Sequence, residues 1–374
     1  MRFLQIKLNT KLAIPRLSFK YSSIILLLVP FTYFLRFMVD WNFTVQSLIW
    51  FLVSFLPILY IFQHNKAVFN KLYIFYIVDI LAMIGVILNG SHSVMYVGVL
   101  LATQWWGAYL YCKRKELKPL EFISTIVILY LLYEVSSSPK VLINSWQYGI
   151  ILSELVRQNT VSLFLCEFLA YDLIYRYECS KKTNIVLFII ALATAVLCDG
   201  MGGILSVSVF FTGILLINRK KDKLEPWKII SLIVLIICIV GLLGQLRNVL
   251  DAITDDNGRF YIWSNYIACV DSFERFLIGA DVSKNDFLIT ANNMHNTALN
   301  WHYCYGIIPA VFFAWRNLKG LIYCIKEKKH IYLIIMCVTL LRAFTDEAEF
   351  AFGGIWTYMW LMSEFKPSKP NTKA

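Results

Sequence analysis

Residues 229–244 have the sequence IISLIVLIICIVGLLG, a continuous apolar stretch without a charged side chain. With its flanks it covers 228–246, close to the roughly 20 apolar residues that an α-helix needs to cross a bilayer. The rest of the chain is similar: 59% of its 374 residues are hydrophobic, 16% are charged, and the mean hydropathy is +0.62. A soluble domain is nearer to half apolar and about one quarter charged. This excess excludes a soluble enzyme with one anchor, a secreted disulfide scaffold and a disordered chain, and it predicts an all-α bundle of membrane helices.

Twelve apolar runs are candidate membrane spans, the last two of them short, so we expect a polytopic bundle of about 12 helices. We expect residues 1–374 to form one integral membrane domain. The predicted spans are residues 21–39, 43–62, 72–89, 94–111, 117–134, 160–177, 184–198, 201–218, 228–246, 296–315, 331–344 and 348–363.

The formal net charge of +11 has a topological explanation. Of the 35 lysines and arginines, 27 fall in one set of alternate loops, among them Arg316 and Lys319 after the predicted tenth span. Because basic residues concentrate in cytoplasmic loops, this predicts an even number of spans with both termini cytoplasmic. No basic patch is left for nucleic acid. The opposite loops carry Lys140, Arg157, Arg247, Arg259, Arg275, Lys284 and Arg342.

The longest of those opposite loops, 247–295, is the expected place for chemistry, since long loops carry function disproportionately. Arg259 opens a short stretch with aromatic or apolar residues at spacings of three and four. That spacing predicts a helix lying at the membrane surface or against the bundle. The loop ends at His295-Asn296, where the next span begins. A helix N-terminus there adds free backbone N–H groups and a partial positive charge.

Several arginines could converge on that helix start. Arg259 lies in the loop that precedes it, as do Arg247 and Arg275. Arg342 is expected on the same outer side of the membrane, in the loop between the last two spans. Arginines beside a histidine suit an anionic lipid head group, above all a phosphate. The alternative is that each is a solvated loop residue.

The sequence gives no reason to expect a metal or another cofactor. His295 and His302 are seven residues apart and share a helical face, but no carboxylate or thiolate nearby completes that face. Four acidic residues fall within or at the ends of predicted spans, and they permit either an ion path or buried pairing with Arg36. They are Asp79, Glu134, Glu167 and Asp172.

The chain resembles the bacterial O-antigen ligase/polymerase family of membrane glycosyltransferases. The family has about twelve helices with a large periplasmic loop before the tenth, and its signature is His-Asn or a similar pair, nine residues, glycine, two residues and then a small residue or tyrosine. Here His295-Asn296 is followed by nine residues and Gly306, with Pro309 as a departure, and the Arg259…Trp263…Gly279 series is similar to the family's Arg…Trp…Gly series. The detailed match covers residues 258–309.

Two further departures are visible. Family members often carry an arginine in the outer loop between the seventh and eighth helices, and residues 198–203 have none. Arg247 or Arg342 would have to take over its role. The chain also lacks the C-terminal soluble domain of related protein-glycosylating enzymes.

The resemblance implies glycosyl transfer on the periplasmic face of the bacterial inner membrane, from an undecaprenyl-diphosphate-linked oligosaccharide. It implies that Arg259 grips the diphosphate and that His295 is the general base. Asn296, Arg247 and Arg342 would bind substrate. The aromatic residues Trp263, Tyr261 and Trp301 would stack on sugars or anchor the protein at the lipid interface.

The O-antigen polymerase, which joins lipid-linked repeat units, is favoured over the ligase, which transfers the glycan to lipid A-core. The compact length and the missing arginine support that order. A chain-length regulator protein is a further candidate partner. A flippase or transporter of lipid-linked sugar is the third interpretation, but it predicts internal repeats, and the sequence contains none.

Overall fold

The computed structural model describes residues 21–38, 43–89, 95–137, 158–198, 201–218, 223–224, 259–281, 285, 294, 296–346 and 348–365. Over these residues the chain is helical, which confirms the expected all-α class. The exception within the described part is a two-residue antiparallel pairing of β1 (Ile217–Asn218) with β2 (Lys223–Leu224).

The described helices follow the apolar runs of the sequence. They are α1 (Tyr21–Met38), α2 (Phe43–His64), α3 (Lys66–Lys71), α4 (Tyr73–Asn89), α5 (Met95–Cys112), α6 (Lys118–Ser137), α7 (Gln158–Glu178), α8 (Ile185–Leu197), α9 (Met201–Leu216), α12 (Arg259–Ala268), α13 (Phe273–Ile278), α15 (Thr297–Tyr305), α16 (Ile307–Lys326), α17 (His330–Thr345) and α18 (Glu349–Glu364). Most of the predicted spans coincide with one of these helices to within a few residues. The predicted span 228–246 lies outside the described residues.

The predicted span 296–315 is wrong. The chain there forms two helices, α15 and α16, which break at Gly306 with φ of +82°. A Cβ at Gly306 would overlap the Leu277 carbonyl oxygen, so glycine is needed for both the backbone angle and the close approach of α13. As a result Arg316 lies in the middle of α16, fully buried, and not in a loop as its place in the charge count assumed.

By length and hydropathy, one described helix is long and apolar enough to cross a membrane. It is α6, at 20 residues and a mean hydropathy of 1.5. The other apolar stretches that stand out in the described residues are shorter, at 10–17 residues.

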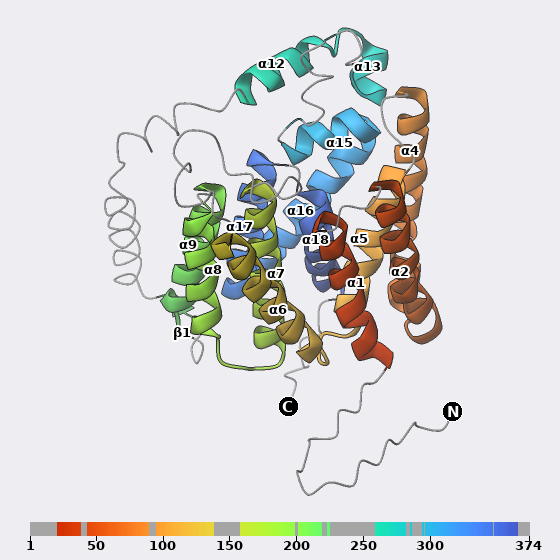
Figure 1. The fold of residues 1–374 in the computed structure, drawn as a ribbon. Helices are drawn as coiled ribbons and strands as arrows, with labels where there is room; N and C mark the ends of the chain where they lie inside the picture. The colour runs from red at the N-terminus through yellow and green to blue at the C-terminus, as the bar shows by residue number, and fades with distance from the viewer. Residues whose placement is uncertain are drawn as a thin grey trace, which may run out of the picture.

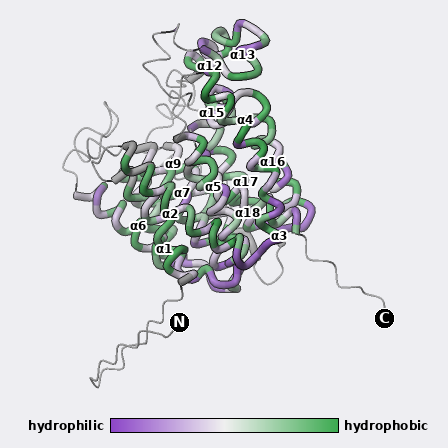
Figure 2. The backbone as a smooth tube through the Cα atoms, turned by 90° about the vertical axis from the view of Figure 1, so that its right-hand side faces the viewer, coloured by the Kyte–Doolittle hydropathy of each residue, from purple (hydrophilic) through white to green (hydrophobic). Residues whose placement is uncertain are grey.

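The long helices run side by side, and α12 and α13 lie across one end of the bundle, above α15 (Figure 1). We call this the α12 end and the opposite one, where α1 begins and α3 lies, the α3 end. Hydrophobic residues dominate the helices, and hydrophilic ones gather near α3 and along part of α12 and α13 (Figure 2). At the centre α5 packs closely against α18, since a Cβ at Gly107 would overlap the Gly354 carbonyl oxygen. Small residues that let helix backbones approach are typical of helix packing in membranes.

Candidate functional site

Two of the predicted site residues, His295 and Arg247, lie outside the described residues. Arg259 is the first residue of α12, and its side chain also falls outside the described part. The geometry of the site therefore rests on the residues around them: Asn296, Arg342, Trp263 and the backbone of Met294.

The start of α15 is held by its own first two residues. Asn296 is the N-cap: its Oδ1 accepts hydrogen bonds from the backbone N–H groups of Ala298 (3.0 Å) and Leu299 (3.1 Å). Its Nδ2 donates to the Phe344 carbonyl oxygen at 3.1 Å. Thus Asn296 satisfies two of the N–H groups that were expected to be free for an anion, and it positions the helix start.

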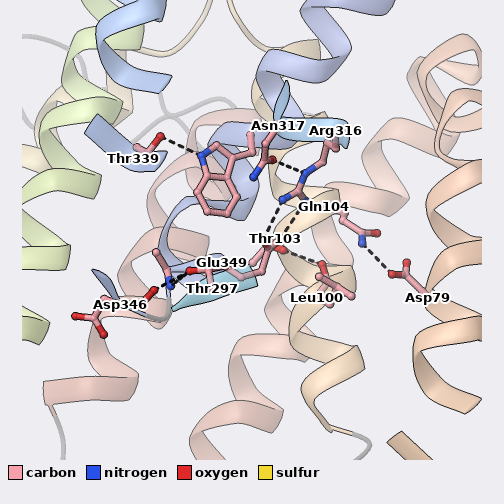
Figure 3. A network of polar contacts seen from close by, with 12 residues as sticks. Asp79, Leu100, Thr103, Gln104, Thr297, Arg316, Asn317, Thr339, Asp346 and Glu349 are labelled. Carbon is pink, nitrogen blue, oxygen red and sulfur yellow. Dashed lines mark hydrogen bonds and ion pairs between the residues drawn. The ribbon is translucent and has the colours of Figure 1, made fainter. Parts of the chain in front are cut away.

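Thr297 attaches the same turn to the segment that joins α17 and α18. Its Oγ1 donates to the Asp346 carbonyl oxygen at 2.8 Å and accepts from the Ala348 N–H at 2.9 Å. Figure 3 shows this contact beside Glu349, the first residue of α18. The start of α15 and the α17–α18 turn therefore form one hydrogen-bonded unit.

Trp263 connects α12 to the residue that precedes His295 in the chain. Its Nε1 donates to the Met294 carbonyl oxygen at 2.8 Å, and its ring packs against Phe344 with centroids 5.6 Å apart. Met294 is fully buried, and its N–H donates to Asn300 Oδ1 at 3.5 Å. Both backbone polar groups of Met294 are thus bound, one by α12 and one by α15.

Arg342 belongs to the last turn of α17 and not to a loop, and its side chain is only 3% exposed. Its Nη2 lies 3.3 Å from Asp346 Oδ2. Its guanidinium also packs against the first turn of α9, because a Cβ on Gly202 would overlap Nη1. A guanidinium therefore lies next to Gly202, in the segment 198–203 that has no arginine of its own.

A second set of contacts ties α12 and α13 to α15. His302 Nε2 donates to the Phe276 carbonyl oxygen at 2.8 Å, which leaves Nδ1 to accept from the Tyr266 hydroxyl at 2.7 Å. Burial raises the pKa of Tyr266 well above its usual range, so the phenol keeps the proton it donates. Gly279, at φ +102°, lies where a Cβ would crowd the His302 and Tyr303 carbonyl oxygens. Both glycines of the sequence motif, Gly279 and Gly306, thus serve the contact between α13 and α15.

Two predicted aromatic residues do not join this site. Trp301 is 5% exposed and packs between Phe313 (centroids 5.4 Å apart) and Trp356 (6.0 Å), which places it in the core. Tyr261 is 57% exposed on the outer face of α12. Trp263 is the aromatic residue that the structure brings to the start of α15.

The sequence interpretation missed a buried ion pair. Arg316 binds Glu349 through two contacts, Nη1 to Oε1 at 3.1 Å and Nη2 to Oε2 at 2.9 Å (Figure 3). Beside it Gln104 donates to Asp79 Oδ1 at 2.9 Å. The signal was Glu349, the last of three acidic residues within 346–349 and the one that opens an apolar run, where a buried carboxylate calls for a cationic partner elsewhere.

Three of the four acidic residues of the predicted spans have partners in the structure: Asp79, Glu167 and Asp172. The expected pairing with Arg36 lies outside the described part, because the Arg36 side chain is not described. Asp172 Oδ2 accepts from Arg176 Nε at 2.7 Å, and Arg176 also binds Glu121 at 2.6 Å. Glu167 Oε1 accepts from the Tyr171 hydroxyl at 2.8 Å.

In the described part of the site, the Arg342 guanidinium is paired with Asp346, whose carbonyl oxygen binds Thr297 at the start of α15. Within the described residues, His, Cys, Asp and Glu do not gather in groups of three that would hold a metal ion. A scan against protein-family models, a search of curated proteins and a search of solved structures each found no match to this chain.

Proposed function

We propose that this protein is an O-antigen polymerase of the bacterial inner membrane. It joins undecaprenyl-diphosphate-linked oligosaccharide repeat units on the periplasmic face. The observation that carries the glycosyltransferase part of the proposal, which polymerase and ligase share, is the buried Arg342 guanidinium against Gly202, on the segment where the resembling family has its arginine. The same residue binds the α17–α18 turn that holds the start of α15, directly after His295 in the chain.

The apolar surface of the bundle supports a membrane location. In water, exposed apolar patches of this extent are unfavourable, whereas hydrocarbon covers them at no cost. Large apolar side chains are exposed along α2 (Leu48, Leu52, Leu59, Phe62), α4 (Ile77, Ile80, Ile84, Ile87, Leu88), α6 (Phe122, Leu129, Tyr133), α8 (Val186, Ile189) and α16 (Ile308, Val311, Leu318, Ile325).

In the proposed reaction an acceptor hydroxyl attacks the anomeric carbon of the lipid-linked donor, and His295 takes the hydroxyl proton. The bond between that carbon and the diphosphate oxygen breaks, and undecaprenyl diphosphate leaves with the bonding electrons. Arg259 and Arg342 would stabilise the charge that develops on the diphosphate, since bidentate guanidinium contacts are strong in a water-poor site. Asn296 and Trp263 position the residues on either side of His295 and are positioning residues in this scheme.

The O-antigen ligase is the second candidate, and one observation favours it. The missing arginine in 198–203 was a reason to prefer the polymerase, and Arg342 brings a guanidinium to that segment. A flippase of lipid-linked sugar is the third.

Deletion of the gene, followed by gel analysis of lipopolysaccharide, separates the three. Loss of a polymerase leaves core with a single repeat. Loss of a ligase leaves bare core while lipid-linked polymer accumulates. Loss of a flippase leaves bare core without that polymer. Only the first pattern agrees with the proposal.

The site assignment has its own test in the complemented strain. His295→Ala and Arg259→Ala should each abolish the ladder of chain lengths at normal expression. Arg275→Ala is the matched control, because Arg275 belongs to the same segment but is paired with Asp281 at 3.3 Å. Full ladders from both His295→Ala and Arg259→Ala would refute the assignment.

A further inference from the structure

A small cavity lies inside the bundle, lined by side chains other than those at the start of α15. Its volume is about 10 Å³, which is room for one water molecule. Its walls come from five helices, α1, α2, α5, α7 and α18, and include Pro30, Tyr33, Trp50, Thr103, Trp106 and Glu167.

Glu167 is the acidic residue of this cavity, and its side chain is only 2% exposed. Oε1 accepts from the Tyr171 hydroxyl at 2.8 Å, and that hydroxyl accepts from Trp106 Nε1 at 2.9 Å. The other oxygen, Oε2, is buried and has no hydrogen-bond partner among the described residues. The indole Nε1 of Trp50, on the cavity wall, is likewise buried with no acceptor among them.

The charges around Glu167 are bound elsewhere. On α7 itself, Arg176 pairs with Asp172 and with Glu121 of α6. Arg342 of α17 pairs with Asp346, and Glu349 of α18 pairs with Arg316. The titratable side chains that line the cavity with Glu167 are Tyr33 and Tyr171, and both are phenols.

Among the side chains that the structure describes, this carboxylate has no cationic partner to offset its burial. Removing an ionised carboxylate from water without a paired charge costs several kcal/mol, and a buried group avoids that cost by becoming neutral. A proton on Oε2 supplies the neutralising charge, and it converts an unsatisfied acceptor into a donor.

We propose that this cavity is a proton-binding site, in which Glu167 carries one exchangeable proton next to one bound water molecule. The water accepts from the Trp50 indole and from the Glu167 carboxyl group. A cavity of one water's volume leaves no room for a hydrated metal ion. This proposal does not depend on the proposed glycosyl transfer, and its test is independent of that function.

The test measures the melting temperature of the purified full-length protein in detergent between pH 5 and pH 8. A proton that the folded state retains and the unfolded state releases makes stability fall as the pH rises above the ordinary glutamate range. The advantage of wild type over Glu167→Gln should therefore shrink by about 2 °C per pH unit. Glutamine keeps the acceptor for Tyr171 and carries no titrating proton.

Two comparisons make the result decisive. Glu134→Gln is the same change near the end of α6, and its melting temperature should match that of wild type at every pH. The melting temperatures are also measured in sodium chloride and in choline chloride at equal ionic strength. Parallel curves for wild type and Glu167→Gln would overturn the proposal, as would a Glu167-dependent stabilisation by sodium that choline does not give.

Infrared spectroscopy gives a second readout, should Glu167→Gln not fold. Wild type near neutral pH should show the C=O stretch of a protonated buried carboxyl group. In Tyr171→Phe that band should move to higher frequency, because the C=O then loses its hydrogen bond. A missing band, or a band that Tyr171→Phe leaves in place, would contradict the assignment.

Discussion

The guanidinium of Arg342 occupies the space that a side chain on Gly202 would fill. A Cβ at that position would overlap Nη1 and come within 3.0 Å of Cζ. The two residues belong to α17 and α9, far apart in the chain, and the contact brings a buried positive charge to the first turn of α9. The α17–α18 turn, held to α15 by Thr297, lies next to the same guanidinium.

Gly202→Ala should displace that guanidinium and leave the fold intact. Alanine suits a helix better than glycine by about 0.5–1 kcal/mol, so little stability is lost. A catalytic group moved by about 1 Å can lose about 100-fold in rate, and we expect a loss of this order in chain-length ladders and in vitro transfer.

Gly213→Ala, on the same helix, is the control. Its Cβ would meet the flexible end of Ile334 instead. Equal activity of the two alanine variants would show that the contact with Arg342 has no functional role.

Asn296→Ala should cost both stability and activity. The variant loses the cap of α15 and the hydrogen bond to the Phe344 carbonyl, and a lost N-cap costs about 1 kcal/mol. Asn184 caps α8 in the same way, with Oδ1 accepting from the Leu187 N–H at 3.3 Å. Thermal melts should show a loss of stability for both variants, larger for Asn296→Ala because it also loses the bond to Phe344, whereas polymer synthesis should fall only in Asn296→Ala. Normal synthesis by Asn296→Ala would contradict the role of this helix start.

Trp263→Phe removes one hydrogen bond to the backbone next to His295. The ring contact with Phe344 can remain, so the stability loss should be about 1 kcal/mol. We expect activity to drop by about tenfold or more, since the backbone of Met294 is then held from one side only. Trp356→Phe provides the comparison, because its Nε1 binds Thr339 Oγ1 at 3.0 Å in the core. A Trp263→Phe enzyme as active as Trp356→Phe would argue against this positioning.

The contact between Tyr266 and His302 predicts a dependence on alkaline pH. The folded-state pKa of Tyr266 is raised by burial, so the unfolded chain releases this proton first. The stability contributed by the neutral phenol is complete below the ordinary tyrosine pKa of about 10 and declines as the pH rises above it. The difference in melting temperature between wild type and Tyr266→Phe should therefore be constant from pH 7 to 9 and shrink above pH 10. If the difference in melting temperature stays constant above pH 10 as well, the pKa of Tyr266 is the same in the folded and unfolded states and the prediction is wrong.

The helices of this protein were predictable because an apolar run is a local property. The ends of α1, α4 and α8 agree with the sequence to within a residue or so, since charged or polar residues flank each run. The site was predictable only in part. The spacing from His295-Asn296 to Gly306 marked the segment, but its glycine interrupts a helix that the hydropathy pattern treated as continuous.

The sequence by itself determined the all-α fold class, the positions of most of the described helices and the segment on which the proposed chemistry rests. These follow from backbone hydrogen bonding and from side chains near one another in the chain. Only the tertiary structure decided that Arg316 is buried inside the bundle. A buried guanidinium requires a paired charge, and here the carboxylate of Glu349, 33 residues away in the chain, supplies it. The tertiary structure also decided that Arg342 supplies the charge beside Gly202, since the space for a guanidinium exists only where α17 packs against a residue without a side chain.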